Sequence, residues 1–267
     1  KQRIDVLIIC VDIGNTTISL GMFQSESNEE SKYVPLARWT IATDAGRTAD
    51  EYLYVIKQLL EMRNMKLTEI KDAAVCSVVP RLTSVFNEMF KSYFGLEVMI
   101  VGPGVKTGLK ILYENTRDVG ADRIVDASAA VKIYGAPVIV VDFGTATVFD
   151  AVSKNNEYLG GAIVPGVEVA LNALYQNTSQ LKRVELNKPP SVIGKNTENA
   201  IQSGIIFGCA DLVTGMVSRF TDELGSNPKV IGTGGLATII VKETDVFDHI
   251  NLDLTLIGLR QILIANR

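Results

Sequence analysis

The sequence predicts an α/β protein built from two related halves. Short runs of β-branched residues alternate with segments whose apolar residues recur at helical spacing. The pattern D-x-G-x-x-T occurs twice, at residues 12–17 and 142–147, each time after an apolar run and before a second β-patterned segment. The two copies lie 130 residues apart (142 − 12). We interpret them as a duplication, with predicted domains at residues 1–117 and 118–267.

The first half contains the signals of one compact α/β unit. Strands are predicted at residues 5–14, 16–23, 36–42, 73–79 and 97–101, and the polar residues 24–33 are predicted to form a loop or hairpin tip. Helices are predicted at residues 48–64 and 82–94. Asp44 or Thr48 is a candidate cap for the first helix, and Pro80 ends the strand before the second.

The second half repeats this order with additions. Its predicted strands are residues 138–142, 145–152, 158–163 and 229–232. Its predicted helices are residues 121–134, 167–176, 196–224, a segment that begins at Leu236, and 254–265. Glycine and proline lie between these segments, as expected at the ends of helices and strands.

Composition excludes several classes of function. The 267 residues include 26 Lys and Arg against 30 Asp and Glu, a net charge of −4. A mildly acidic chain has no general electrostatic attraction to nucleic acid or to an anionic membrane. We find no stretch of about 18 consecutive apolar residues, the length needed to span a bilayer. The chain is therefore expected to bind neither nucleic acid nor a membrane.

Cysteine and histidine usage narrows the chemistry further. Three widely spaced cysteines in apolar stretches, Cys10, Cys76 and Cys209, predict buried thiols in a reducing cytosol rather than disulfides. A cytoplasmic protein is therefore expected. The one histidine, His249, disfavours a zinc site, a Cys-His nucleophile and a Ser-His-Asp triad, and we expect it at the surface or at the end of a strand.

The repeated D-x-G-x-x-T pattern has a physical use. Glycine permits a tight turn and lets backbone approach a bulky anion, and exposed turn amides form a concave anion site. The carboxylate needs a cation or a water molecule between itself and a phosphate. Two such hairpins that face each other could clamp the phosphates of a nucleotide. The alternative is a pair of ordinary hairpins with Asp at the turn.

A third glycine-rich element, VIGTGGLA at residues 230–237, reads as strand, turn and helix. Its glycines would let a flat ring or a phosphate lie against backbone, and the start of the helix adds a partial positive field. The spacing does not match the dinucleotide fingerprint G-x-G-x-x-G, and the P-loop pattern does not occur in the sequence. A P-loop enzyme is therefore excluded.

These three elements, in this order, resemble the superfamily of acetate and sugar kinases, heat-shock chaperones and actin. Within it, the chain is similar to the type III pantothenate kinases. Seven segments carry the resemblance over essentially the whole chain: DIGNTTISLGMF, VGADRIVDA, VDFGTATVFDAV, GGAIVPGVEVALNAL, GKNTENAIQSGIIFG, IGTGGLA and LIGLRQI. The resemblance implies two duplicated ribonuclease H-like (actin-like ATPase) domains with a central cleft. It also implies ATP-dependent phosphorylation of pantothenate to 4′-phosphopantothenate, the first step of coenzyme A biosynthesis.

The resemblance also implies roles for individual residues. The ATP-phosphate loop would be Asp12, Ile13, Gly14, Asn15, Thr16, Thr17, Ile18 and Ser19, with Thr145 binding ATP from the second hairpin. Asp142 would hold a monovalent cation, potassium or ammonium, and Mg²⁺ would accompany ATP. Pantothenate would contact Gly120, Ala121, Asp122, Arg123, Tyr113 and Thr197, with Asp122 as the proton acceptor. A homodimer with the substrate pocket near the subunit interface is also implied.

The residue types suit these roles. Asp122 lies at the start of a predicted helix, which stabilises its charged form, so it should orient the acceptor hydroxyl rather than act as a strong base. Arg123 suits an anionic substrate because guanidinium binds a carboxylate through two parallel hydrogen bonds. From the residues alone, the alternatives are a helix cap with a surface ion pair at Asp122 and Arg123, a packing aromatic at Tyr113, and a helix N-cap at Thr197.

Two departures from the family pattern affect neighbouring loops. Val148 stands where the family usually has Thr, which could weaken nucleotide contacts slightly. Thr116 follows Asn115 where the family usually has Pro, which loosens the loop that carries Tyr113. Neither departure removes a proposed catalytic group.

Two other functions remain open from the sequence. One is another small-molecule kinase or phosphatase of the superfamily, and the other is a non-catalytic accessory regulator of gene expression. The presence of Asp12, Asp122, Asp142 and Thr145 argues against an inactive scaffold. For an active kinase, we expect Asp12, Asp142 and Asp122 to converge on one crevice.

Overall fold

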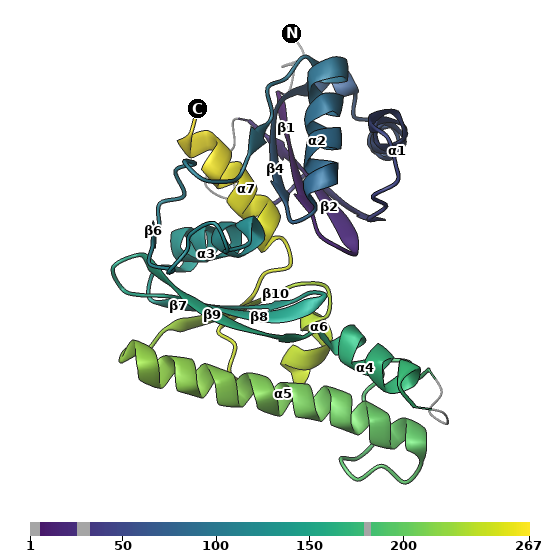
Figure 1. Cartoon of the computed structure of the whole chain (residues 1–267), viewed down its shortest axis with the longest axis vertical. Helices are drawn as coiled ribbons and strands as arrows, with labels where there is room; N and C mark the ends of the chain where they lie inside the picture. Colours follow the sequence, from purple (N-terminus) through teal and green to yellow (C-terminus); the bar gives the residue numbers. More distant parts are fainter. Residues whose placement is uncertain (1–5, 26–32, 179–182) are drawn as a thin grey trace. The chain divides into compact units, whose positions relative to one another are not determined.

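The structure, a computed structural model, describes residues 6–25, 33–178 and 183–267 (Figure 1). Most of the predicted polar loop at 24–33 lies outside these residues. The chain forms two compact units. Unit 1 comprises Lys1–Leu109, Glu114–Ala129 and Asp253–Arg267, and unit 2 comprises Lys110–Tyr113 and Ala130–Leu252. The chain therefore passes between the units more than once, whereas the sequence predicted a single boundary after residue 117.

Unit 1 is built on a five-stranded sheet with the order β3-β2-β1-β4-β5. The strands are β1 (Leu7–Ile13), β2 (Thr17–Gln24), β3 (Ala37–Ala42), β4 (Ile70–Ser77) and β5 (Met99–Ile100). The first three pair antiparallel, while β1 with β4 and β4 with β5 pair parallel. Parallel pairing brings the carboxyl ends of β1 and β4 to the same edge, and in their register Asp12 lies opposite Cys76.

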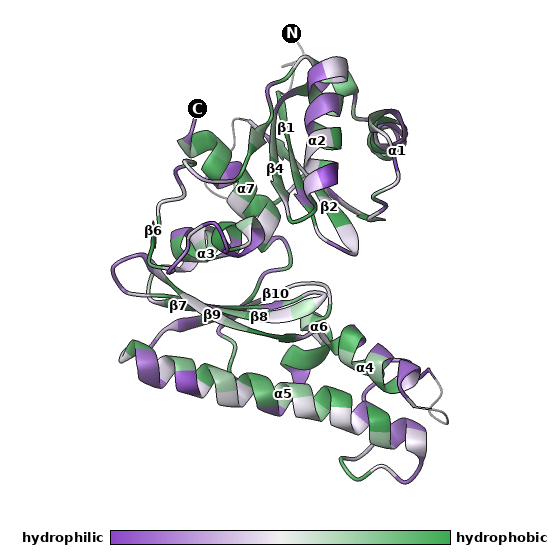
Figure 2. Cartoon of the chain, viewed as in Figure 1, coloured by the Kyte–Doolittle hydropathy of each residue, from purple (hydrophilic) through white to green (hydrophobic). Residues whose placement is uncertain are grey.

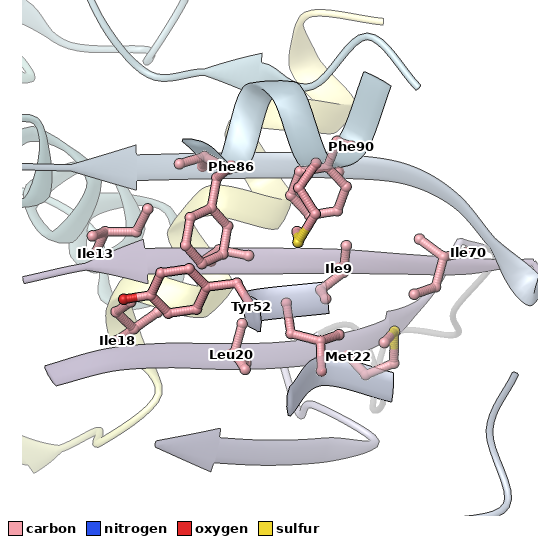
Figure 3. Packing of buried hydrophobic residues seen from close by; sticks show 14 of the residues in the cluster. Ile9, Ile13, Ile18, Leu20, Met22, Tyr52, Ile70, Phe86 and Phe90 are labelled. Carbon is pink, nitrogen blue, oxygen red and sulfur yellow. The ribbon is translucent and has the colours of Figure 1, made fainter. Parts of the chain in front are cut away.

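Helices cover this sheet. The helices α1 (Ala49–Glu61) and α2 (Pro80–Met89) enclose a core of aliphatic and aromatic side chains, shown in Figure 3. A π-helical segment, η2 (Phe90–Phe94), extends α2, and a short 3₁₀ helix, η1 (Leu67–Glu69), precedes β4. The C-terminal helix α7 (Leu254–Ala265) packs against β1, β2 and β4, which is why the end of the chain belongs to unit 1.

Helix α3 (Ala121–Tyr134) begins in unit 1, where it packs on α7. Gly258 of α7 lies so close to α3 that an added Cβ would be 2.6 Å from the Val125 carbonyl oxygen and 3.1 Å from Ala129 Cβ. Only glycine fits this contact without displacing backbone. The contact also fixes where the first turn of α3 lies in unit 1.

Unit 2 is built on a six-stranded sheet with the order β11-β10-β7-β8-β9-β6. The strands are β6 (Lys110–Ile111), β7 (Val138–Phe143), β8 (Ala146–Val152), β9 (Glu157–Pro165), β10 (Lys229–Thr233) and β11 (His249–Ile250). Apart from β6, the arrangement matches unit 1. The consecutive strands β7, β8 and β9 pair antiparallel, and β10 and β11 extend the sheet from β7 by parallel pairing. Each D-x-G-x-x-T copy lies at the first hairpin of its sheet, which agrees with the predicted duplication.

Among the residues that the structure describes, the helical segments that lie wholly in unit 2 are α4 (Val167–Gln176), α5 (Thr197–Leu224), α6 (Ala237–Ile240) and a 3₁₀ turn, η3 (Val241–Glu243). A buried cluster joins β7 and β8 to α5 and α6 through Val141, Phe149, Val213 and Ile240. Figure 1 shows α5 running along the sheet of this unit as one uninterrupted helix.

The structure corrects several expectations. By length and mean composition α5 is long and apolar enough to cross a membrane, a property that our search for consecutive apolar residues did not detect because polar residues interrupt the helix (Figure 2). A core helix passes the same test, and α5 buries Val213 and Val217 in its unit. Two short strands, β6 and β11, were not predicted, and the strand predicted at 97–101 has only two paired residues. Cys209 is only partly buried, unlike the other two thiols.

Candidate active site

The first D-x-G-x-x-T copy forms the tight turn between β1 and β2. The Gly14 N–H donates to the Thr17 carbonyl at 3.0 Å. An added Cβ on Gly14 would lie 3.1 Å from that oxygen, so glycine relieves crowding in the turn. Three residues at the tip are exposed: Asn15, Thr16 and Thr17. Exposure at the tip is what an anion-binding turn requires, and the binding itself stays a prediction.

The two isoleucines that flank this turn have a structural role. Ile13 and Ile18 pair across the hairpin, and both are fully buried in the core of unit 1 (Figure 3). Asp12 and Ser19 form the next pair and are partly buried. Ile13 and Ile18 can therefore reach a nucleotide only through their backbone, while their side chains anchor the turn to the core.

The candidate proton acceptor, Asp122, lies in the first turn of α3. Its Oδ1 accepts a hydrogen bond from the Arg123 N–H at 2.8 Å. An added Cβ on Gly120 would overlap the same oxygen, so the absent side chain of Gly120 leaves space for the carboxylate. Arg123 is buried, with 8% of its surface exposed. A surface ion pair, the alternative from the sequence, is therefore wrong for Arg123.

The charges of three carboxylates in unit 1 act on the buried thiol of Cys76. Burial raises the pKa of Cys76 well above its ordinary value, and the charges of Asp12, Asp122 and Asp126 raise it further. The end of β1 and the start of α3 are therefore close enough for both aspartates to act on one thiol. The sequence had placed Asp12 and Asp122 in different halves of the chain.

Asp126 is a charged residue that we did not predict at this site. It follows Asp122 by four residues on α3, which puts both on one face of the helix. Asp126 is only 3% exposed. The four-residue spacing of the two aspartates in DRIVD could have indicated from the sequence that Asp126 shares a helix face with Asp122.

The second D-x-G-x-x-T copy forms the turn between β7 and β8 in unit 2. The Gly144 N–H donates to the Ala146 carbonyl at 3.1 Å, and Thr145 at the tip is exposed. The Gly166 N–H donates to the Thr145 carbonyl at 3.0 Å. An added Cβ on Gly166 would lie 2.8 Å from the Thr145 carbonyl carbon. The start of α4 therefore packs directly on this turn, a contact that the sequence did not indicate.

The third glycine-rich element lies beside the second hairpin. Thr233 of β10 pairs with Asp142 of β7. Gly234 has a φ of +91°, and an added Cβ there would overlap Asp142 Oδ1 and lie 2.6 Å from the Phe143 nitrogen. The turn therefore needs glycine for both its conformation and its closeness to Asp142. The helix that follows, α6, has only four residues, so it is much shorter than the helix we expected.

Tyr113 lines a cavity of about 350 Å³ in unit 2. The other lining residues come from β8, β9 and the end of α5: Ala151, Leu159, Gly160, Gly161, Phe220, Glu223 and Leu224. The Tyr113 ring lies 3.2 Å from the position of a Cβ added to Gly160, whose φ is +120°. Glycine at that position therefore makes space for the aromatic ring.

Thr197 lies far from this cavity in the same unit. It is the first residue of α5 and is exposed. The N-cap is Asn196, whose side chain accepts from the Asn199 N–H at 2.8 Å, so the cap that we considered at Thr197 is wrong. Phe220, at the cavity, is 23 residues further along α5, which corresponds to about 34 Å at 1.5 Å per residue. Within one chain, the structure does not bring Tyr113 and Thr197 together.

Each unit therefore holds part of the predicted site. Asp12, the first turn and Asp122 belong to unit 1, whereas Asp142 and Thr145 belong to unit 2. The convergence of Asp12, Asp142 and Asp122 on one crevice stays a prediction. Among the described residues, no group of three or more His, Cys, Asp or Glu side chains could hold a metal ion.

Comparison with solved structures supports the fold. The chain is similar to a Baf family transcriptional activator from Campylobacter jejuni, with a TM-score of 0.58, 20% identity and coverage of 97% of this chain and 98% of the other. It is also similar to component A of (R)-2-hydroxyglutaryl-CoA dehydratase from Acidaminococcus fermentans, with a TM-score of 0.54, 13% identity and coverage of 98% and 97%. At these identities the likeness concerns the fold alone. The predicted pair of ribonuclease H-like, actin-like ATPase domains is confirmed.

Sequence comparison is more specific. The model of the type III pantothenate kinase family matches residues 8–219. The type III pantothenate kinase of Moorella thermoacetica is 45% identical over 260 residues, which cover 97% of this chain and 100% of the relative. That of Anaeromyxobacter sp. is 45% identical over 261 residues, which cover 98% and 100%. The chain therefore belongs to the type III pantothenate kinase family.

Proposed function

We propose roles for these residues in the ATP-dependent phosphorylation of pantothenate, the first step toward coenzyme A. The reaction itself follows from family membership, because the curated relatives are 45% identical over nearly the whole chain. The observation that supports the proposed roles is that the first turn and Asp122 belong to the same unit, where Asp12 lies opposite Cys76 in the β1–β4 register and the charges of Asp12 and Asp122 both raise the pKa of that thiol. The proposed phosphate turn and the proposed proton acceptor are thus parts of one unit.

In this proposal the first turn, Asp12 to Ser19, binds the phosphates of ATP. Its exposed tip offers backbone N–H groups and threonine hydroxyls as donors to the phosphate oxygens. The second turn contributes Thr145, which is also exposed. Phosphoryl transfer depends mainly on positioning and on neutralising the phosphate charge, so a frame of fixed donors is the main contribution of the protein.

Asp122 orients the acceptor alcohol and takes its proton. As the bond from the 4′-hydroxyl oxygen to the γ-phosphorus forms, the bond from that phosphorus to the β,γ-bridging oxygen breaks and ADP leaves. The hydroxyl proton passes to the Asp122 carboxylate. In a loose transition state this transfer occurs late, when the alcohol has become acidic. Gly120, Ala121 and Arg123 complete the contacts with pantothenate, and Arg123 suits its carboxylate.

Cations belong to the phosphate chemistry. Mg²⁺ is usually bound through substrate phosphates and one or two carboxylates rather than by a dedicated protein cage. Asp12 and Asp142, each beside one of the two turns, could each supply one such carboxylate. We assign the monovalent cation, potassium or ammonium, to Asp142, whose oxygens lie against the glycine turn at Gly234. Such a cation would offset phosphate charge at the second hairpin.

The proposed enzyme is a homodimer in which a partner copy completes the pantothenate site. Tyr113 lines a cavity of about 350 Å³ together with Phe220 near the end of α5. Thr197 of the same chain lies about 34 Å away along α5. If both residues contact pantothenate, Thr197 has to come from the second subunit.

Complementation between subunits tests this arrangement. Tyr113→Ala and Thr197→Ala are each expected to weaken activity when they are purified alone. Co-expression should restore up to about one intact site per heterodimer. In that site the Thr197→Ala subunit supplies an unchanged Tyr113, and the Tyr113→Ala subunit supplies an unchanged Thr197. Co-expressed protein that is no more active than the two separate variants would show that both residues act within one chain, or that the site is assigned wrongly.

A coupled assay of ADP release with pantothenate as the acceptor, with and without potassium, tests the reaction. Asp122→Asn should lower kcat by about 10²- to 10⁴-fold and leave the fold intact. A panel of other hydroxylated acceptors separates this function from that of another small-molecule kinase. No turnover with any monovalent cation would contradict the proposed function, and an unchanged rate in Asp122→Asn would contradict the role of Asp122.

We also propose that the enzyme acts in the cytoplasm and binds neither nucleic acid nor a membrane. The net charge of −4 and the three free cysteines support this proposal. The likeness to a Baf family transcriptional activator concerns the fold alone at 20% identity, so it does not favour a regulatory function.

A further inference from the structure

We propose that Thr43 is a positioning residue for ATP, because it holds the carbonyl groups of the first phosphate turn in one orientation. This inference rests on the assignment of that turn to ATP, and it adds a residue that the family resemblance did not indicate. Thr43 follows β3 and lies 29 residues after Gly14 in the sequence. It would act on the nucleotide only through the turn.

Thr43 makes two hydrogen bonds to the turn. Its backbone N–H donates to the Thr16 carbonyl at 2.9 Å, and its hydroxyl donates to the Gly14 carbonyl at 2.7 Å. Thr17 and Ala42 are the last paired residues of β2 and β3, so Thr43 stands just beyond the end of this ladder. One residue therefore restrains a carbonyl on each side of Asn15.

These bonds determine where the N–H groups of the turn point. A trans peptide group is planar, so its N–H points opposite to its C=O. The Gly14 carbonyl shares a peptide group with the Asn15 N–H, and the Thr16 carbonyl shares one with the Thr17 N–H. Because both carbonyls point toward Thr43, both N–H groups are directed away from it. Without the Thr43 hydroxyl, the peptide group between Gly14 and Asn15 would lose one of its restraints.

The core of unit 1 holds Thr43 in place. The adjacent residue, Asp44, donates its N–H to the Tyr52 hydroxyl at 3.2 Å, and that hydroxyl donates to the Asp44 carbonyl at 2.9 Å. Tyr52 is fully buried and packs against Phe86, with ring centroids 4.9 Å apart. Figure 3 shows the Tyr52 hydroxyl near Ile13 and Ile18, beside the turn. The link therefore runs from the core through Tyr52 and Asp44 to Thr43.

A fixed turn lowers the cost of binding ATP, since its N–H groups need no reorientation when the phosphates arrive. The simpler alternative is that Thr43 only satisfies backbone groups at the end of a hairpin. The two explanations differ in what they predict for catalysis. Loss of a purely structural bond would lower stability without selecting one substrate, whereas loss of a positioning bond would weaken ATP binding in particular.

The test compares Thr43→Val, which removes only the hydroxyl bond, with Thr43→Ser, which keeps a hydroxyl. Thr40→Val, an exposed position on β3, is the matched control. We expect Thr43→Val to raise KM for ATP about five- to tenfold, the effect of losing one net hydrogen bond. KM for pantothenate should stay unchanged, and Thr43→Ser should recover most of the loss. Calorimetric titration with ATP alone should give the same change in Kd.

The outcomes that overturn the inference are specific. They are an unchanged KM and Kd for ATP in Thr43→Val, an equal rise in KM for both substrates, or a Thr43→Ser variant as weak as Thr43→Val. Tyr52→Phe is the second variant if Thr43→Val does not fold, and an unchanged KM for ATP there also contradicts the inference. If the unaltered protein does not phosphorylate pantothenate but Thr43→Val still weakens ATP binding, the proposed function fails and this inference stands.

Discussion

Gly258 offers the sharpest test of the packing that places the start of α3 in unit 1. In Gly258→Ala the new Cβ would lie 2.6 Å from the Val125 carbonyl oxygen, whereas an ordinary contact begins at 3.4 Å. The two helices would have to separate by about 0.8 Å (3.4 − 2.6), because backbone cannot rotate away as a flexible side chain does. Overpacking of this kind costs about 1–3 kcal/mol.

The same substitution has an opposing benefit. Alanine is more favourable than glycine inside a helix by about 1 kcal/mol. If overpacking costs about 3 kcal/mol, the free energy of unfolding therefore falls by about 2 kcal/mol in total. For a chain of this size we expect Tm to fall by about 4–8 °C. Because α3 carries Asp122, a shift of this kind should also reduce kcat by about tenfold.

Differential scanning fluorimetry and the coupled kinase assay measure the two effects. Gly208→Ala in α5 is the matched control, since an added Cβ there meets nothing within 4 Å. It should keep or raise Tm, because only the helix preference acts. A Gly258→Ala variant as stable as the control would refute the argument that α3 and α7 pack too closely for any side chain at this position.

Three further predictions concern other parts of the molecule. Gly120→Ala should lower kcat more than it raises KM for pantothenate, because the added Cβ displaces the Asp122 carboxylate; a change in KM alone would favour a direct contact with substrate. Partial burial raises the pKa of Cys209 to about 11, and the other two thiols are fully buried. Maleimide at pH 8 should therefore label the native protein slowly and react first at Cys209, which mass spectrometry of the labelled protein would show. Burial alone raises the pKa of Asp248, but hydrogen bonds from Lys229 and a backbone N–H outweigh it and lower the pKa. The charged Asp248 therefore stabilises the folded protein above a pH of about 4, and this stabilisation is lost as the pH falls through the lowered pKa. Urea unfolding of Asp248→Asn should show a free energy of unfolding about 0.5–1 kcal/mol lower at pH 7 and a smaller difference from the unaltered protein in acid.

Local sequence patterns predicted most of the secondary structure. The helices at 121–134, 167–176 and 254–265 have the predicted bounds. Apolar periodicity and turn residues act over a few neighbouring positions, so the sequence contains this information directly. The short strands β6 and β11 were missed because two-residue pairings with distant strands leave no periodic signal.

Several residues of the candidate site could also be predicted from the sequence. In the structure, strand ends carry the two D-x-G-x-x-T turns and the glycine turn at 232–235, as predicted. These turns could be predicted because a tight turn depends on glycine and hydroxyl residues within a few positions of one another. The resemblance named Asp122, but nothing local to it indicated that Gly120 leaves space for its carboxylate.

Only the tertiary structure decided which distant residues act together. It placed α7 on the sheet of unit 1, brought Asp12 and Asp122 to one buried thiol, and put Tyr113 and Thr197 at opposite ends of α5. It also joined Thr43 to a turn 29 residues away. These relations depend on how complete elements pack, and packing is set by the shapes of many side chains at once, which no short stretch of sequence contains.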